Sequence, residues 1–156
     1  MKLFLFYILT LSFGNLMQEN KKDELPIKVG IELPDTICVG QQDIPIILVV
    51  ENTTSEVLSI RNPAHWGNAF PRIKQGDKEI ATIKVKINPA VFKNIIQING
   101  NETVKIKFEY TLDKIFSLES YSTGQYNIYF ELCPDEKTLI KSDMFTFYNQ
   151  LEIYFR

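Results

Sequence analysis

Residues that commonly carry catalysis are scarce in this sequence. Its 156 residues include one histidine, His65, and two cysteines, Cys38 and Cys133. Acid–base and nucleophilic catalysis usually depend on His, Cys or paired carboxylates. The sequence also has no Gly-x-Ser-x-Gly and no Ser-x-x-Lys motif. We therefore expect a protein that is not an enzyme and has no catalytic residues, with His65 exposed on a loop in preference to acting as a base.

Motifs for metals, phosphates and nucleic acids are also missing. The sequence contains no His-x-His, no Cys-x-x-Cys and no calcium-loop pattern, and its 7 glycines form no Gly-x-Gly-x-x-Gly. The 17 Lys and Arg residues against 19 Asp and Glu give a net charge of -2 without long runs of one sign. These absences predict no metal site, no cofactor and no nucleic-acid partner.

The first 26 residues differ from the rest of the chain. Lys2 is followed by a mostly apolar run from Leu3 to Phe13 and then by Gly14, which is typical of an export signal cut after Gly14. A helix over that run would rise only about 16 Å, so a membrane anchor is the weaker alternative, and a buried first strand is another. Residues 15–26 are polar and aperiodic, which predicts a disordered lead-in. We expect an exported protein, periplasmic or extracellular, with no stable membrane anchor after cleavage.

Regular alternation dominates the remainder. In the runs Glu102–Tyr110 and Gly124–Leu132, apolar and polar residues alternate one by one, which indicates strands with one buried face. Such strands are stable only when a second sheet covers that face. The length suits one domain with its own core. The predicted fold is an all-β, antiparallel β-sandwich of about eight or nine strands over residues 27–156.

The other expected elements follow the same pattern. Ile44–Val50 is apolar on both faces and predicts a central strand, whereas Pro71 makes Phe70–Gln75 a short edge strand. Glu79–Ile87 alternates and predicts a strand, and one helical turn is expected between Thr111 and Thr123. Further strands are expected at 27–33, 36–39, 57–61, 94–98 and 144–155. The predicted core comprises Val29, Ile31, Leu48, Ile83, Val104, Ile106, Phe108, Tyr126, Ile128, Phe130 and Phe147.

One motif resembles a known fold family. Ser122-Thr-Gly-Gln-Tyr-Asn-Ile128 is similar to the corner of immunoglobulin domains, with Tyr126 in the position of the corner tyrosine and Ile128 in that of the cysteine. The span from 27 to 155 resembles bacterial immunoglobulin-like modules, which implies an immunoglobulin-like sandwich. The run Leu48–Thr54 and the later Gly124-Gln-Tyr126 also resemble, weakly, the Bacillus-type intracellular proteinase inhibitor family, although no reactive-loop residue can be matched.

Two functions are consistent with these features. The first is an exported, non-catalytic binding or accessory module that contacts a protein or a glycan through its end loops. The alternative is a proteinase inhibitor that presents a loop to an active site. Strand alternation brings three connections to one end of the sandwich: 34–43, 62–69 and 111–123. The candidate binding residues on and beside them are His65, Trp66, Phe70, Phe116 and Tyr121.

Two points of this interpretation depend on geometry. Trp66 could be an interface anchor, or it could fold back as a plug over the core, which is the favoured alternative. In the same strand order, Cys38 and Cys133 lie at opposite ends of the sandwich. The separation exceeds the roughly 7 Å that a disulfide tolerates between Cα atoms, so the sequence predicts no bridge.

Overall fold

The computed structural model describes residues 26–38, 41–116 and 123–150. The predicted export signal, most of the predicted lead-in, Tyr121 and residues 151–155 of the predicted last strand lie outside these ranges. Within them, no helix is long and apolar enough to cross a membrane. The elements are β1 (Ile27–Glu32), β2 (Thr36–Cys38), β3 (Ile47–Asn52), β4 (Leu58–Arg61), β5 (Ala69–Gln75), β6 (Lys78–Ile80), η1 (Pro89–Lys93), β7 (Ile95–Ile98), β8 (Thr103–Lys107), α1 (Leu112–Ile115), β9 (Gly124–Leu132), β10 (Ile140–Lys141) and β11 (Phe145–Gln150).

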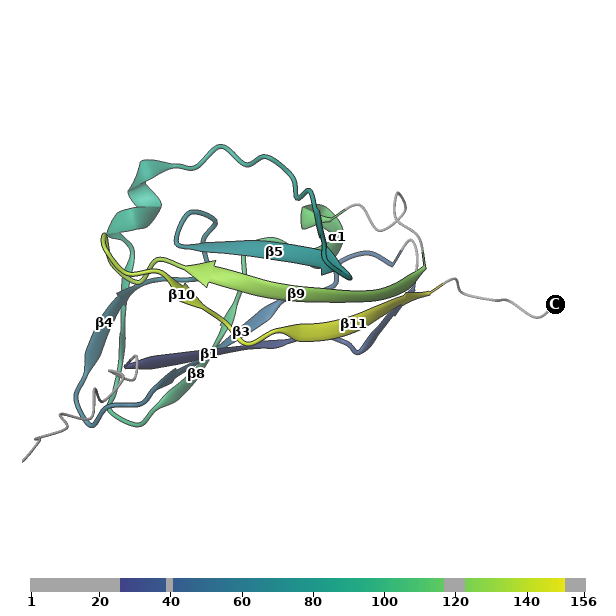
Figure 1. Ribbon diagram of the computed structural model, residues 1–156. Helices are drawn as coiled ribbons and strands as arrows, with labels where there is room; N and C mark the ends of the chain where they lie inside the picture. Colours follow the sequence, from purple (N-terminus) through teal and green to yellow (C-terminus); the bar gives the residue numbers. More distant parts are fainter. Residues whose placement is uncertain (1–25, 39–40, 117–122, 151–156) are drawn as a thin grey trace, which may run out of the picture.

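The strands form antiparallel sheets, as predicted (Figure 1). One sheet has the order β1-β3-β8, and a second has the order β2-β11-β9-β5-β6 with β10 beside β9. β4 and β7 form a small third sheet that follows on from the β3–β8 pair. Every pair is antiparallel except β2 with β11, which is parallel. The fold class is therefore all-β. The described residues hold eleven strands rather than eight or nine, in part because the two-residue β10 has no signal in the sequence.

One hydrophobic core joins the two larger sheets. Alternate residues of β9 are buried, as the alternation predicts, and they meet buried residues of β1, β3 and β11. Val104 and Ile106 of β8 are only half-buried, although both pack against the core. β8 pairs with β3 alone in this sheet, and an outer strand is covered less well than an inner one. The buried residues that confirm the predicted core are Val29, Ile31, Leu48, Phe108, Tyr126, Ile128, Phe130 and Phe147.

The prediction that Phe70–Gln75 is an edge strand is wrong. β5 lies between β9 and β6 and pairs with β9 over six residues, including Pro71. β6 pairs only with Ile73, Lys74 and Gln75. Pro71 therefore lies beyond the part of β5 that β6 covers. A residue without a backbone donor is tolerated in a strand where no second neighbour needs that donor.

The prediction of a strand over Glu79–Ile87 is also wrong. β6 ends at Ile80, and residues 81–88 have no regular secondary structure. Ile83, placed in the core by the sequence, is 40% exposed, while Val85 and Ile87 are half-buried against the core. The alternation identifies the inward side at Val85 and Ile87 but not at Ile83. A strand also requires a neighbour with which to pair. We call residues 81–88 the arch, after their course above the sheets (Figure 1).

Two further features lie near the ends of the sheets: the short helix α1 and the two cysteines. The helical turn expected after Thr111 is α1, and its residues Leu112 and Ile115 are buried. The Leu112 amide donates to the Ile44 carbonyl at 2.8 Å, which joins α1 to the chain entering β3. Cys38 pairs with Gln150 beyond the Gly124 end of β9, whereas Cys133 follows the other end of β9. Both cysteines are free, as the predicted strand order requires.

Candidate functional site

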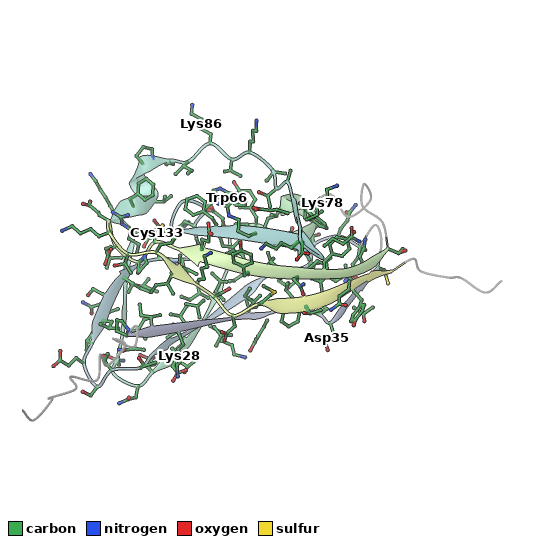
Figure 2. All side chains as sticks on the ribbon, in the orientation of Figure 1. Lys28, Asp35, Trp66, Lys78, Lys86 and Cys133 are labelled. Carbon is green, nitrogen blue, oxygen red and sulfur yellow. The ribbon has the colours of Figure 1, made fainter. Side chains whose placement is uncertain are left out.

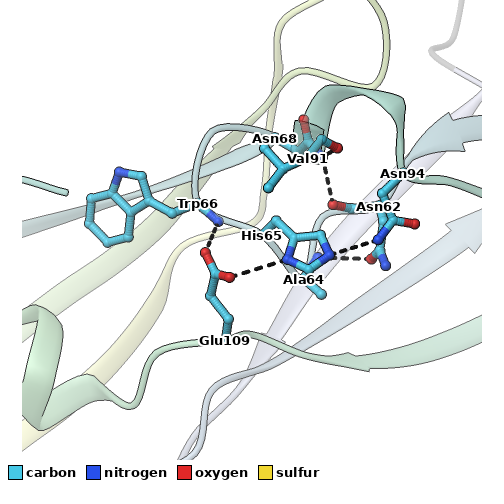
Figure 3. Close-up of polar contacts among 8 residues, drawn as sticks. All are labelled: Asn62, Ala64, His65, Trp66, Asn68, Val91, Asn94 and Glu109. Carbon is cyan, nitrogen blue, oxygen red and sulfur yellow. Dashed lines mark hydrogen bonds and ion pairs between the residues drawn. The ribbon is translucent and has the colours of Figure 1, made fainter. Parts of the chain in front are cut away.

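The loop between β4 and β5 is shaped by asparagine side chains. Asn62 Oδ1 accepts a hydrogen bond from the Ala64 amide at 3.0 Å, and Asn68 Nδ2 donates to the carbonyls of Asn62 and Val91, both at 3.0 Å. Asparagine favours turns because its side chain bonds to nearby backbone groups. The loop therefore has a defined shape in which His65 and Trp66 point in different directions (Figure 3).

Glu109 joins this loop to the segment that follows β8. One carboxylate oxygen of Glu109 lies 3.2 Å from His65 Nδ1, and the other accepts the backbone N–H of Trp66 (Figure 3). His65 Nε2 lies 2.8 Å from Asn94 Nδ2. An amide nitrogen can only donate, so Nε2 is the acceptor and Nδ1 carries the proton given to Glu109. In this arrangement both ring nitrogens of a neutral His65 are engaged.

The network holds His65 in place through both of its ring nitrogens. A general base needs an acceptor within reach of the proton it removes, and Nε2 is already occupied by Asn94. The thiol of Cys133 is a poor nucleophile at neutral pH because burial raises its pKa, although Arg61 opposes that effect. Among the described residues, no group of three or more His, Cys, Asp and Glu side chains could hold a metal ion. The network joins three segments that are distant in sequence: the loop between β4 and β5, Asn94 before β7, and Glu109 after β8.

Trp66 and Phe116 are core residues. Trp66 is 7% exposed and packs against Phe108 and Tyr110, with ring centroids 6.1 and 5.7 Å apart. This position corresponds to the plug alternative. Phe116 is fully buried, 5.5 Å from the ring of Tyr126. Neither ring is available to a partner in this structure.

The other candidate residues have different surroundings. Phe70 is half-buried on β5, lies opposite Glu131 of β9, and packs against the hydrophobic core. His65 is half-buried at the rim, with 27% of its side chain exposed beside Glu109. Tyr121 lies outside the described residues.

The structure brings some of these residues together and separates others. His65 and Trp66 share Glu109, and Trp66 packs through Phe108 toward Phe130 of β9. Phe116 packs instead against Tyr126, which precedes Phe130 by four positions on β9. Four residues of a strand span about 13 Å. The structure thus separates Phe116 from the Trp66 cluster along β9.

The prediction that the three connections meet at one end is wrong. The Cys133 amide donates to the Asn68 carbonyl, which places the 62–69 loop at the Leu132 end of β9, whereas Cys38 lies beyond its Gly124 end.

Two residues of the site have no signal in the sequence. Glu109 belongs to the polar row of a predicted strand, and polar rows normally face solvent. Its partner His65 is 44 positions away. Asn94 lies in what the sequence predicts to be the start of a strand. Only the folded chain shows that both side chains converge on the one histidine.

The outer face of the second sheet carries a patch of aromatic and charged residues. Lys74 Nζ and Lys141 Nζ lie 5.6 and 5.7 Å from the ring centroid of Tyr129. Arg72 pairs with Glu131 at 3.0 Å and with Glu79 at 3.2 Å, and the hydrogen bond to Glu131 raises the Arg72 pKa. The charges of this patch are largely matched within it.

Two adjoining hollows lie beside β1 and β10, with volumes of about 310 and 240 Å³. Both are lined by Ile27 and Ile140. Asp135 borders the smaller hollow, but one of its carboxylate oxygens already accepts the backbone N–H groups of Lys137 and Thr138 at 2.7 and 2.6 Å. The larger hollow is also lined by Lys28, Lys141 and Asp143, so the two hollows together present apolar and charged residues near the start of the described chain.

Comparison with known proteins gives no assignment. The chain matches no protein-family model, and no curated protein matches it.

Proposed function

We propose that this protein is an exported, non-catalytic immunoglobulin-like module that binds a protein or a glycan through the loops at one end of its sheets. The observation that carries the proposal is the strand order. β1, β3 and β8 lie in one sheet, and β11, β9 and β5 lie side by side in the other. In immunoglobulin domains the first, second and fifth strands share one sheet, while the seventh, sixth and third share the other. The correspondence takes β4 as a continuation of β3, β7 as the fourth strand, and β2, β6 and β10 as additions beside β11, β5 and β9. It differs from the immunoglobulin order at β7, which pairs with β4 and not with β8.

The position of Tyr126 supports the same fold. Tyr126 is fully buried on β9, where it stacks on Phe147 at 5.6 Å with an angle of 18° between the ring planes. Ile128, at the position of the cysteine in the resemblance, is also fully buried. A sandwich without a disulfide needs apolar packing between its sheets, and these residues supply it.

The polar rim around His65 is the part of the end loops that a partner could reach. His65 and Glu109 are 27% and 33% exposed at their side chains, and both are held by the network described above. Preorganised polar groups of this kind provide specificity at little cost in conformational entropy. Loops fixed on a rigid sheet scaffold commonly perform binding.

The binding proposal is tested with loop variants of the full-length protein. His65→Ala and Asn94→Ala remove the rim contacts, while Thr146→Ala on the outer sheet face serves as the matched control. Each protein is presented to a glycan array and to an envelope extract of the source. We expect one partner to be retained by the wild type and the control and lost by both loop variants, with thermal unfolding confirming that all four proteins are folded. A partner that binds the loop variants as well as the wild type would contradict the use of these loops.

A second candidate, proteinase inhibition, is favoured by the arch. Residues 81–88 connect β6 to η1 without regular secondary structure, and Lys84 and Lys86 are exposed on this segment. Extended segments bind clefts by adding a strand to them. Titration against serine and cysteine proteinases tests this candidate. Stoichiometric inhibition that is lost in Lys84→Ala or Lys86→Ala would favour this candidate. Cleavage of the protein, or no effect on the proteinases, would leave the binding module as the proposed function.

A further inference from the structure

Within residues 82–87, a single backbone hydrogen bond ties the arch to α1. The Ile83 amide donates to the Ile115 carbonyl at 3.1 Å, and in the part of the chain that the structure describes this is the one backbone hydrogen bond made by residues 82–87. Val85 and Ile87 pack against the core from the same segment. The arch is therefore fixed to the domain without belonging to any sheet.

The sequence of the arch is that of a strand. Ile83-Lys-Val-Lys-Ile87 alternates β-branched residues with lysines, a composition with high β-propensity. In an extended chain, the backbone groups of successive residues point to opposite edges. With the Ile83 amide bonded to Ile115, an extended arch would direct the amides of Lys84 and Lys86 to the other edge. Figure 2 shows the Lys86 side chain projecting away from the molecule. An edge of this kind is a template for an added strand.

The charge of the arch has one sign. From Ile80 to Asn101 the chain contains three lysines, Lys84, Lys86 and Lys93, and no Asp or Glu. Glu79, just before this stretch, is paired with Arg72 at 3.2 Å. The ion pairs found among the described residues include neither Lys84 nor Lys86. The exposed side of the arch is therefore cationic.

The positive charge of the arch determines which kind of strand can pair favourably with its outer edge. A second copy of the arch, paired antiparallel about Val85, would place Lys84 opposite Lys86, and like charges across a strand pair are destabilising. An acidic strand would place carboxylates at those positions and gain from the same lysines. Lysine on an open edge thus discourages self-association and favours an acidic partner.

We propose that the arch is a strand-addition site for an extended segment of a partner protein that carries Asp or Glu at alternate positions. The backbone of that segment pairs with the outer edge of residues 82–87, and its carboxylates lie against Lys84 and Lys86. The inference rests on the proposed function in that it treats the protein as a binding module. It adds a surface separate from the His65 loop and states the chemistry of its partner.

The test uses the full-length protein and three end-capped peptides. The first is Thr-Glu-Val-Glu-Val-Glu-Thr, the second has Lys in place of each Glu, and the third repeats the first with alternate backbone nitrogens methylated. We expect the acidic peptide to bind at least about tenfold more tightly than either of the others, since the second reverses the charge and the third blocks strand pairing. On binding, amide hydrogen exchange should slow at residues 82–87.

Matched charge variants locate the site. In K84E/K86E the affinity for the acidic peptide should fall by at least about tenfold, because the carboxylates then face like charges. The control K28E/K107E makes the same change in net charge on the β1-β3-β8 sheet and should stay within about threefold of the wild type. Thermal unfolding confirms that both variants are folded.

Several outcomes would overturn the inference. These are equal binding of the acidic and basic peptides, no binding of the acidic peptide, unchanged affinity in K84E/K86E, or binding without protection of residues 82–87. Binding of phosphatidylserine vesicles or heparin without the peptide would assign the arch to polyanionic surfaces instead. A partner captured through the His65 loop while the acidic peptide fails would retain the proposed function and reject only this inference. Binding of the acidic peptide, with no partner captured through the His65 loop, would retain this inference and reject the binding role proposed for that loop.

Discussion

Trp66 stands edge-on against Tyr110, with their ring centroids 5.7 Å apart and their planes at 84°. This is a favourable arrangement for two aromatic rings. The backbone N–H of Trp66 is held by Glu109, just before Tyr110 in the chain. The ring of the only tryptophan is therefore clamped over the core beneath a polar rim.

Replacing Trp66 by Ala should destabilise the fold by about 3 to 5 kcal/mol, because it removes a large buried side chain and leaves a cavity. The free energy of unfolding in urea measures this change. The wild-type fluorescence should be blue-shifted and protected from iodide quenching, and it reports on Trp66 alone since the chain has 1 Trp. Tyr148→Ala, at a residue that is 50% exposed, is the control. An unfolding midpoint unchanged by Trp66→Ala would contradict the plug.

The two faces of the strands should differ in sensitivity. Phe108 and Phe130 are 2% and 0% exposed, so replacing either by Ala should cost about 3 to 5 kcal/mol. Lys105 and Asn127 point to the polar faces, and their replacement by Ala should stay within about 0.5 kcal/mol. Urea unfolding of the four variants measures the contrast. Equal losses at both pairs of positions would show that the faces are assigned wrongly.

Substitution of the buried polar residue Asn52 should strongly destabilise the fold. Its side chain is fully buried, and Nδ2 donates to the carbonyls of Glu56, Ile98 and Asn99 at 2.7, 3.1 and 2.9 Å. Asn52→Asp would direct a carboxylate at these carbonyls and should cost about 3 kcal/mol or more. Gln97→Ala, on the exposed side of β7, is the control. Chemical denaturation of both variants checks the expectation, which fails if Asn52→Asp is as stable as the control.

The cysteines should remain thiols in the purified full-length chain. Cys38 and Cys133 lie near opposite ends of β9, a strand of nine residues that spans about 30 Å. Mass spectrometry without reductant should find both thiols. Burial raises the Cys133 pKa, so its alkylation by iodoacetamide near pH 8 should be slower than that of glutathione and should accelerate at higher pH. Loss of two hydrogens within the monomer would disprove the strand order.

Asp113 should contribute to acid sensitivity. Burial raises its pKa, but the neighbouring Thr111 hydroxyl and the Ile44 N–H lower the pKa by more, so the net shift is downward. A pKa that is lower in the folded than in the unfolded state gives stability that is present above the unfolded value, about 3.9, and is lost as pH falls through the folded value. The stability difference between wild type and Asp113→Asn should therefore shrink below about pH 4. Urea midpoints over a pH series test this, and parallel profiles would contradict it.

The sequence alone determined which residues face inward. The alternation in Gly124–Leu132 predicts both the bounds of β9 and its buried side, since a pleated strand directs successive side chains to opposite faces. The same pattern identifies Val85 and Ile87 as the residues of the arch that pack against the core, although it places the exposed Ile83 there as well. The apolar spacing after Thr111 predicts α1.

Only the tertiary structure decided which strands have neighbours. β5 is inside a sheet although it contains Pro71, and the arch lies outside every sheet although it has the composition of a strand. Strand pairing depends on backbone groups that are distant in the chain, and periodicity carries no information about them. For the same reason the sequence identifies His65 as a candidate but gives no indication of Glu109 and Asn94. Their contacts with His65 exist only after the loops they belong to have been brought together.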